Sequence, residues 1–280
     1  MSLAPEALPR LHPLSRDFVW TERRPKALRR LTADQKAAFE TRGFVTLGGV
    51  FAPDEIAAVT AAIDPLEAEA EARLREAGGR ISISDADAIT FTTHIARRDP
   101  VLRAFAAHPA IADICHDLIG DDVRLYWDQS VYKKTQKRQE FPWHQDNGYT
   151  FVEPQQYLTL WLPLVDVDER NGCPWIAPGM HRLGTLDHWV TDIGLKCLDE
   201  VADALPAPAK AGDAVVFSSL TPHRTGPNLG ASVRKAYILQ YAHDPSVATS
   251  RDGRRATQDH PERQFKILEG GQPVSRLSEV

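Results

Sequence analysis

The sequence predicts a mainly β protein with flanking helices. Helical patterns are confined to the first 120 residues, and the texture changes after Gly120. The later segments alternate apolar and polar residues and are rich in aromatic and β-branched side chains, which is typical of strands. Turns rich in Pro, Gly and Asn separate them, which favours an antiparallel barrel or sandwich. The predicted strands cover residues 123–134, 157–167, 214–218 and 235–241.

The length and layout predict one full-sized core preceded by an arm. A chain of 280 residues is long enough for a single large β-rich unit. Four prolines and many arginines in the first 30 residues predict an extended segment that either lies on the body or is partly disordered. The expected organisation is an arm (1–30) and one domain (31–280) made of a helical part (31–120), a β-rich core (121–245) and a C-terminal tail (246–280).

The charge, the apolar runs and the cysteines of the chain indicate which kinds of partner and cellular compartment to expect. A formal net charge of −5 gives no electrostatic basis for binding nucleic acid or an anionic membrane. No apolar run approaches the roughly 20 residues of a membrane span, and the N-terminus lacks the apolar region of a secretory signal. The three scattered cysteines predict packed free thiols rather than disulfides or a thiolate zinc site. We therefore expect a cytoplasmic protein with a small-molecule partner.

The first helix has a signal at each end. Thr32 and Gln35 fit a capping box, in which each side chain satisfies a free backbone N–H of the first turn. Gly43 is suited to the left-handed conformation that ends many helices. The following apolar residues, 44–47, predict a short strand.

Two longer helices are expected before Gly120. Pro53 suits a first helical position, and the pattern continues to about Gly79 with a break expected near Pro65. A further helix is predicted over residues 100–118 as one continuous element.

The stretch around His144 carries the first metal-ligating pattern. Side chains two positions apart on an extended segment point to the same side, so His144 and Asp146 can meet at one point. His223 follows an apolar strand and a proline, and is the best candidate for a third ligand. Two histidines and one carboxylate on one face suit Fe(II) with open positions, but zinc accepts the same donors.

Arg234 favours iron over zinc. It stands 11 positions after His223, since 234 − 223 = 11, and begins a predicted strand. Its guanidinium can hold a carboxylate through two parallel hydrogen bonds, which suits the distal carboxylate of an oxo-diacid that also reaches the metal. A zinc hydrolase has no need for this arginine.

These motifs together resemble the phytanoyl-CoA dioxygenase family of Fe(II)/2-oxoglutarate-dependent oxygenases. The resemblance covers about residues 31–243 and includes Trp143-His144-Gln145-Asp146, Asn171-Gly172-Cys173-Pro174, Pro178-Gly179-Met180-His181 and Pro222-His223-Arg224-Thr225. It implies a double-stranded β-helix (jelly-roll, cupin-like) core and an oxygenase domain. Where the family has a small hydroxyl residue after Pro-Gly, this chain has Met180.

The resemblance also assigns roles to residues. His144, Asp146 and His223 would bind Fe(II), and Arg234 would bind the C5 carboxylate of the cosubstrate 2-oxoglutarate. Asp146 favours oxygenation over halogenation, because related halogenases lack this carboxylate and bind chloride there. Further cosubstrate contacts carried over from the family are Gln129, Thr225, Trp161 and, with less support, Lys133.

Residues near the motif are candidates for contact with the substrate, although packing within the loop explains them equally well. They are Asn147, Tyr149 and Phe151. Residues 183–210 are predicted to form either a lid over the site or an ordinary surface loop. His181 is expected to hydrogen-bond a turn rather than bind metal.

The implied activity is hydroxylation of an unactivated C–H bond by O2 and 2-oxoglutarate, with release of succinate and CO2. Alternatives are desaturation or cyclisation at the same site, a zinc-dependent hydrolase, or a non-catalytic metal-binding jelly roll. The sequence leaves open whether the substrate is an acyl-CoA, an amino acid, an osmolyte or a secondary metabolite. The oligomeric state is equally unreadable.

Overall fold

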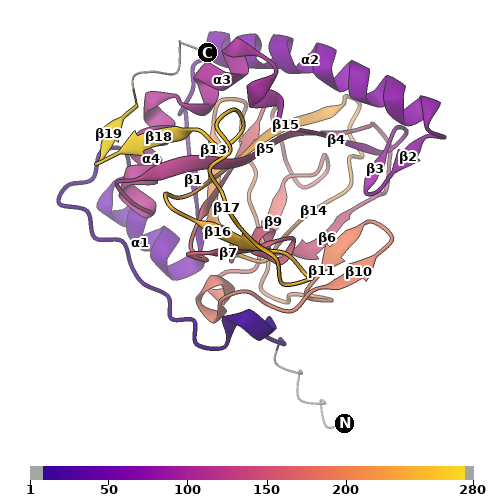
Figure 1. The fold of residues 1–280 in the computed structure, drawn as a ribbon. Coiled ribbons are helices and arrows are strands. Elements are labelled where there is room, and N and C mark those ends of the chain that lie inside the picture. Colours follow the sequence, from indigo (N-terminus) through magenta and orange to yellow (C-terminus); the bar gives the residue numbers. More distant parts are fainter. Residues whose placement is uncertain (1–8, 275–280) are drawn as a thin grey trace, which may run out of the picture.

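The protein is built on one large antiparallel sheet and a smaller second sheet (Figure 1). The computed structural model describes residues 9–274. The main sheet contains β1 (Phe44–Leu47), β2 (Arg80–Ile81), β3 (Ser84–Asp85), β4 (Ile89–Thr93), β5 (Val123–Lys133), β8 (Leu158–Pro163), β13 (Ala214–Ser218), β15 (Arg234–His243), β18 (Lys266–Glu269) and β19 (Gln272–Pro273). The second sheet contains β6 (Phe141–His144), β9 (Pro174–Ile176), β12 (Leu205–Pro206) and β14 (His223–Thr225).

Two smaller pairings complete the β structure. One is a three-stranded sheet of β7 (Phe151–Glu153), β16 (Val247–Thr249) and β17 (Arg255–Thr257). The other is a hairpin of β10 (Trp189–Thr191) and β11 (Gly194–Lys196). The structure thus confirms the four strands predicted at β5, β8, β13 and β15 and the mainly β fold class.

The two faces of the main sheet have different partners. On β8, Leu160 and Leu162 pack in the large apolar cluster that includes the helices. Trp161 lies between them in sequence and packs instead in a second cluster that includes Ile176 of β9. Because alternate residues of a strand point to opposite faces, one face of the sheet packs on helices and the other on the second sheet. The functional cavity lies on this second side.

The helices are α1 (Ala33–Arg42), α2 (Pro53–Glu76), α3 (Pro100–Ala106) and α4 (Pro109–Leu118). The structure confirms both ends of α1. Thr32 and Gln35 form the capping box, and Gly43 ends the helix with φ of 81°. An added Cβ at Gly43 would lie 2.5 Å from Nδ1 of His181, so close packing requires glycine as well.

The predicted break near Pro65 is wrong, because α2 continues through it. The residue four positions earlier is exposed, so water can satisfy the carbonyl that proline leaves without an N–H partner. Buried side chains on both sides of the proline, Ile63 and Leu74 among them, anchor the two halves of the helix.

The single helix predicted over 100–118 is also wrong, because the structure divides it into α3 and α4. Proline disfavours helical conformation in the residue before it, and His108 before Pro109 is extended with ψ of 138°. The His108 side chain accepts a hydrogen bond from the backbone N–H of Ala110 and so begins α4.

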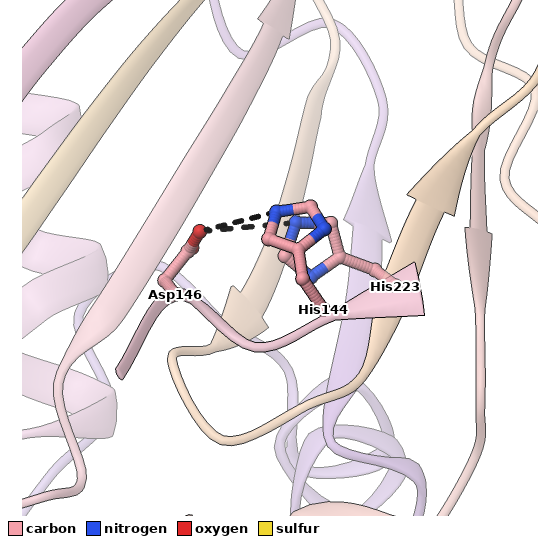
Figure 2. Close-up of side chains that lie close together, drawn as sticks. All are labelled: His144, Asp146 and His223. Atoms are coloured by element: carbon pink, nitrogen blue, oxygen red, sulfur yellow. Dashed lines mark ion pairs between the residues drawn. The ribbon is translucent and has the colours of Figure 1, made fainter. Parts of the chain in front are cut away.

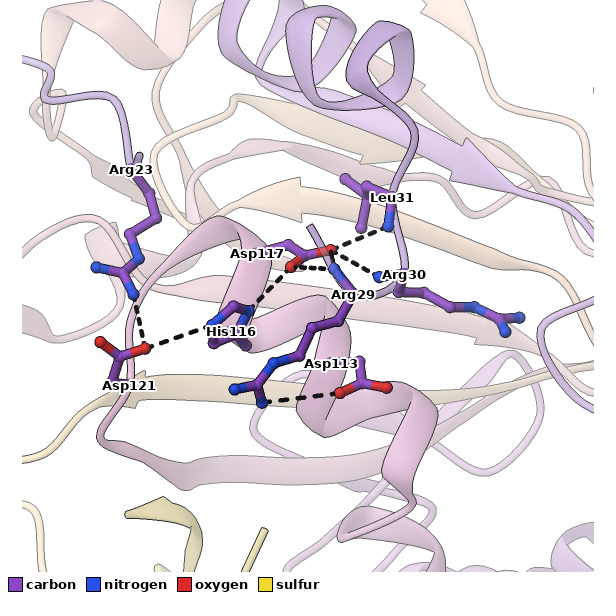
Figure 3. Close-up of polar contacts among 8 residues, drawn as sticks. All are labelled: Arg23, Arg29, Arg30, Leu31, Asp113, His116, Asp117 and Asp121. Carbon is purple, nitrogen blue, oxygen red and sulfur yellow. Dashed lines mark hydrogen bonds and ion pairs between the residues drawn. The ribbon is translucent and has the colours of Figure 1, made fainter. Parts of the chain in front are cut away.

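A buried carboxylate fixes the chain just before α1 (Figure 3). Asp117 at the end of α4 is fully buried and accepts hydrogen bonds at 2.9 Å from the backbone N–H groups of Arg29, Arg30 and Leu31. Arg29 also lies 3.9 Å from the half-exposed carboxylate of Asp113. The end of the N-terminal arm is therefore held by its backbone rather than by its many charged side chains.

Replacing Asp117 with asparagine should destabilise the fold by about 1–3 kcal/mol, because an amide has one acceptor oxygen instead of two and its NH2 group would face the N–H of Arg29. Urea unfolding measures the change. Asp113→Asn is the matched control, and its long exposed ion pair should contribute at most about 0.5 kcal/mol. Equal effects of the two substitutions would contradict the assigned role of Asp117.

Candidate metal and cosubstrate site

Three potential metal ligands converge on one point (Figure 2). One donor atom from each of His144, Asp146 and His223 lies within 4.8 Å of the other two. Oδ1 of Asp146 lies 3.8 Å from Nε2 of His144 and 3.9 Å from Nε2 of His223. Within residues 9–274 no other group of three or more His, Cys, Asp or Glu has this geometry.

Strand pairing brings the two histidines together. His144 ends β6, His223 begins β14, and the two residues are direct partners in the antiparallel ladder. Asp146 follows in a short 3-10 helix over Asp146–Gly148. The pair His144 and Asp146, predicted from spacing alone, therefore lies beside His223, which is 79 positions after His144, since 223 − 144 = 79.

Hydrogen bonds fix which nitrogen of each ring is available. Nδ1 of His144 lies 2.8 Å from the carbonyl of Pro142, and Nδ1 of His223 lies 3.0 Å from the carbonyl of Thr221. A carbonyl only accepts, so Nδ1 carries the proton and donates in both rings. Each Nε2 then presents its lone pair toward Asp146, which is the arrangement a metal ligand needs.

The site also sets the charge states that a cation needs. Burial, with the neighbouring imidazole, lowers the pKa of His144 to about 3, and burial lowers the pKa of His223 to about 4. Both rings are neutral donors at pH 7. Burial raises the pKa of Asp146, while hydrogen bonds from Thr159 and Gln240 favour its charged form. Two neutral imidazoles and a held carboxylate fit a divalent metal of the iron or zinc type.

The neutral buried histidines predict that the metal-free protein is acid-labile. His144 and His223 have folded pKa values below the ordinary 6.5, so the unfolded chain binds protons more readily. The contribution of these two histidines to the free energy of unfolding is fully present above about pH 6.5. It should fall by up to about 1.4 kcal/mol per pH unit for each histidine as the pH decreases toward 4. Urea unfolding at several pH values tests this, and His223→Gln should reduce the slope. A stability independent of pH over this range would contradict it.

A buried cavity joins the three ligands to Arg234. Its lining includes His144, Asp146, His223, Trp161 and Arg234. The Arg234 side chain is 1% exposed and donates one hydrogen bond, from Nη1 to the carbonyl of Val131 at 3.0 Å. Among the residues that the structure describes, its Nε and Nη2 have no hydrogen-bond partner.

An orphaned guanidinium in a buried site indicates a missing anionic partner. Buried polar groups are normally paired, and an unpaired charge is costly. Burial lowers the pKa of Arg234 to about 9, so the group is still charged at pH 7. Its carbon Cζ lies 5.4 Å from the ring centre of Trp161, within cation–π range. The cavity thus offers a metal-binding cluster at one place and a carboxylate-binding fork at another.

The other predicted cosubstrate residues divide. Gln129 and Thr225 line the cavity, as Trp161 does. Lys133 does not line it, because the Lys133 ammonium donates to the carbonyls of Thr225 at 3.0 Å and Gly226 at 2.6 Å. Lys133 therefore does not contact the cosubstrate in this geometry. It holds the backbone of the segment whose Thr225 lines the cavity.

A second, outer cavity of about 540 Å³ adjoins the first. The two share Phe91, Gln129, Phe141, His144 and Asp146 in their linings. The outer cavity therefore reaches the ligand cluster without including Arg234, and its volume is that of a small-molecule site.

Of the three predicted substrate contacts, the structure places one at the outer cavity. Tyr149 lines it, and the Tyr149 hydroxyl accepts a hydrogen bond from the backbone N–H of Leu195 at 3.1 Å. This bond connects the β10–β11 hairpin, within residues 183–210, to a residue that lines the cavity.

The structure places the other two residues outside both cavities, which favours the alternative of packing within the loop. Asn147 is fully buried, and its side chain donates to Thr185 and accepts from the backbone N–H of Val152. Phe151 stacks on His12 of the arm with ring centres 4.8 Å apart. Both side chains are engaged in packing within the fold and line neither cavity.

Sequence reasoning missed several residues of the site. Thr159 and Gln240 hydrogen-bond Asp146, and Phe217 packs on His223 with ring centres 4.4 Å apart. Strand alternation could have indicated both polar residues, because side chains an even number of positions apart point to the same face. Thr159 is two positions from Trp161 on β8, and Gln240 is six positions from Arg234 on β15. As predicted, His181 lies outside the cluster and bonds the Glu40 carbonyl, and the three cysteines are free and buried.

An antiparallel jelly-roll-type fold, with two histidines, a carboxylate and a buried arginine in one cavity, defines the class of non-haem 2-oxoglutarate-dependent oxygenases. The family model described as phytanoyl-CoA dioxygenase (PhyH) matches residues 39–236, more than half of the chain. The chain belongs to the phytanoyl-CoA dioxygenase family, and it is an Fe(II)- and 2-oxoglutarate-dependent oxygenase.

The chain is similar to individual relatives and solved structures, of which the last described below shares the fold. The ectoine dioxygenase of Bordetella bronchiseptica is 26% identical over 238 residues, covering 75% of each chain. The solved structure of EctD from S. alaskensis with 2-oxoglutarate and 5-hydroxyectoine is 25% identical, covers 84% of this chain and 82% of that one, and has a TM-score of 0.62. SnoK, an α-ketoglutarate-dependent carbocyclase from nogalamycin biosynthesis, is 24% identical over 90% of this chain and 96% of that one, with a TM-score of 0.64.

No helix within residues 9–274 is both long enough and apolar enough to cross a membrane.

Proposed function

We propose that the protein hydroxylates an unactivated C–H bond of a small organic substrate. O2 and 2-oxoglutarate are consumed, one oxygen atom enters the product alcohol, the other enters succinate, and CO2 is released. One observation carries this proposal: three metal-compatible donors and a buried arginine with unpaired N–H groups lie in the same cavity.

His144 and His223 would bind Fe(II) through Nε2, and Asp146 through its carboxylate. When bound, Fe(II) supplies the redox chemistry that couples decarboxylation of 2-oxoglutarate to oxidation of the substrate. The protein contributes orientation. Carbonyls hold the two imidazoles in one tautomer, and Thr159 bonds the carboxylate of Asp146.

Arg234 would bind the distal carboxylate of 2-oxoglutarate through Nε and Nη2, its two unpaired nitrogens. Trp161 packs beside the guanidinium, and Gln129 and Thr225 offer further polar groups in the same cavity. The dicarboxylate would satisfy the buried charge and span from Arg234 to the metal ligands. This requirement distinguishes the oxygenase from a zinc hydrolase or a non-catalytic metal-binding protein.

Anaerobic addition of Fe(II) and 2-oxoglutarate tests the proposal. The protein should develop a weak visible charge-transfer band, and admitting O2 should yield succinate. Tight zinc binding without the band and without succinate would overturn the proposal.

The outcome of the reaction is tested separately once a substrate is found. A hydroxylase places one atom from labelled O2 in its product. A product without the label but with a new double bond or ring would assign desaturation or cyclisation to the same site.

A further inference from the structure

The outer cavity is positioned to hold the substrate. It shares His144 and Asp146 with the inner cavity, whereas Arg234 lines only the inner one. A molecule in the outer cavity would therefore approach the metal ligands while the place beside Arg234 is left for 2-oxoglutarate. This assignment rests on the proposed function of the inner cavity.

The lining of the outer cavity is almost free of charge. Among the residues that the structure describes, Asp146 is the one carboxylate of the lining, which contains no lysine or arginine, and it belongs to the ligand cluster. The other polar groups include six hydroxyls, the amides of Gln129 and Gln240, and the ring N–H of Trp127; the hydroxyls belong to Ser82, Ser84, Thr93, Tyr126, Tyr149 and Thr150.

The nearest cation along the chain is directed elsewhere. Arg80 precedes the lining residues Ile81 and Ser82, but its guanidinium donates to the backbone carbonyl of Asp192 in the turn of the β10–β11 hairpin. It therefore links two hairpins and supplies no counter-ion to the lining. Arg263, whose charge acts on the lining residue Tyr126, lies outside the lining.

Aromatic and apolar surfaces form the rest of the wall. The rings of Phe91 and Phe141 lie 5.5 Å apart at 52°, and Trp127 and Ile83 complete this side. Gln129 accepts a hydrogen bond from Nε1 of Trp127 at 3.2 Å, which leaves its NH2 group as the donor that it can offer a ligand. Such a wall suits a ring or flat apolar body carrying a few hydroxyl or carbonyl groups.

A charged substrate would lose hydration here without gaining a partner. Burying an ionised group is costly unless it is paired and hydrogen-bonded. The charges of the inner cavity offer no compensation, because Fe(II) and Arg234 cancel formally against Asp146 and the dicarboxylate 2-oxoglutarate. Phosphate groups of a CoA thioester, or the ends of a zwitterion, would find no counter-ion in the described lining.

We propose that the substrate is an uncharged ring compound bearing hydroxyl or carbonyl groups, bound among the aromatic and hydroxyl-bearing side chains that line the outer cavity. Volume agrees, since about 540 Å³ accommodates a molecule of several fused or linked rings. The cavity would select uncharged over charged molecules because it lacks a counter-ion, as much as through its contacts with the substrate.

Three probes that differ mainly in charge test the proposal: hydroxynaphthoic acid as its carboxylate, its methyl ester and its primary amide. Each is titrated into the anaerobic protein with Fe(II) and 2-oxoglutarate, and the change in the visible band gives the affinity. We expect the ester and the amide to bind at least tenfold more tightly than the carboxylate. Equal or tighter binding of the carboxylate, or no binding of any probe while the band is present, would overturn the proposal.

Absence of the band itself would instead overturn the proposed function, so the two failures are distinguishable. A charge introduced into the wall gives a second measurement. Ile83→Lys places an ammonium at a half-buried position of the β2–β3 turn, and Ile83→Met is the uncharged control of similar length. The lysine variant should bind the carboxylate at least tenfold more tightly than the methionine variant does. No difference between them would count against an uncharged wall as the source of selectivity.

Discussion

Replacing His223 with alanine is expected to remove iron binding and 2-oxoglutarate turnover together. Metal-binding free energies of about 10–16 kcal/mol, shared among the ligands of a site, correspond to a few kcal/mol for each ligand. Loss of one ligand should therefore weaken iron binding by roughly 100-fold or more. Iron content after desalting and succinate formation measure the two effects.

His181→Ala is the matched control. This histidine is fully buried and bonds the Glu40 carbonyl, outside the ligand cluster. The control variant should lose stability and keep its iron. If His223→Ala retained iron and activity while His181→Ala lost them, the ligand assignment would be wrong.

Replacing Arg234 with alanine is expected to weaken 2-oxoglutarate binding by roughly 100-fold, about 3 kcal/mol, because a buried carboxylate would lose its charged, forked partner. Iron binding should change little, since Arg234 is not a ligand. Titration of the anaerobic band measures the affinity.

Two further variants define what Arg234 contributes. Arg234→Lys keeps the charge but loses the fork, so it should recover part of the affinity and remain weaker than the natural residue. Arg170→Ala removes an exposed arginine that pairs with Asp168 on the surface, and should leave 2-oxoglutarate affinity unchanged. An unaltered affinity in Arg234→Ala would exclude Arg234 from the cosubstrate site.

The sequence predicted best those features that depend on a few neighbouring residues. The capping box of Thr32 and Gln35 and the terminal Gly43 define α1 without help from the rest of the fold. The pair His144 and Asp146 similarly needs only an extended segment. Their encounter with His223 depends on the ladder between β6 and β14; the strand and proline before His223 made it the best candidate, and the family resemblance supported it.

Residues near the motif were harder to assign, because proximity in sequence does not give direction. Asn147 is adjacent to Asp146 but turns into the fold, where Thr185 and Val152 satisfy its amide. Lys133 is on the right strand, yet the carbonyls of Thr225 and Gly226 hold its ammonium. In both residues, hydrogen bonds with nearby backbone groups hold the side chain away from the position that was predicted for it.

The short strands β2, β3 and β4 were not predicted, and they fall in the segment assigned to the helical part. Strands of two to five residues carry little periodicity, so tertiary pairing determines them. Their position matters for function, because residues 81–84 contribute to the outer cavity. The signal for the substrate wall was therefore weaker than the signal for the metal ligands.

One long edge of β5 is shared between segments from opposite parts of the chain. β4 pairs with its C-terminal half, from Gln129 to Lys133, while β18 pairs with its beginning at Val123 and Arg124. Without β18, the start of β5 would present unpaired N–H and C=O groups, and such an edge invites addition of a foreign strand and aggregation. The C-terminal residues, remote from the catalytic cavity, thus serve to keep each molecule from joining its sheet to another.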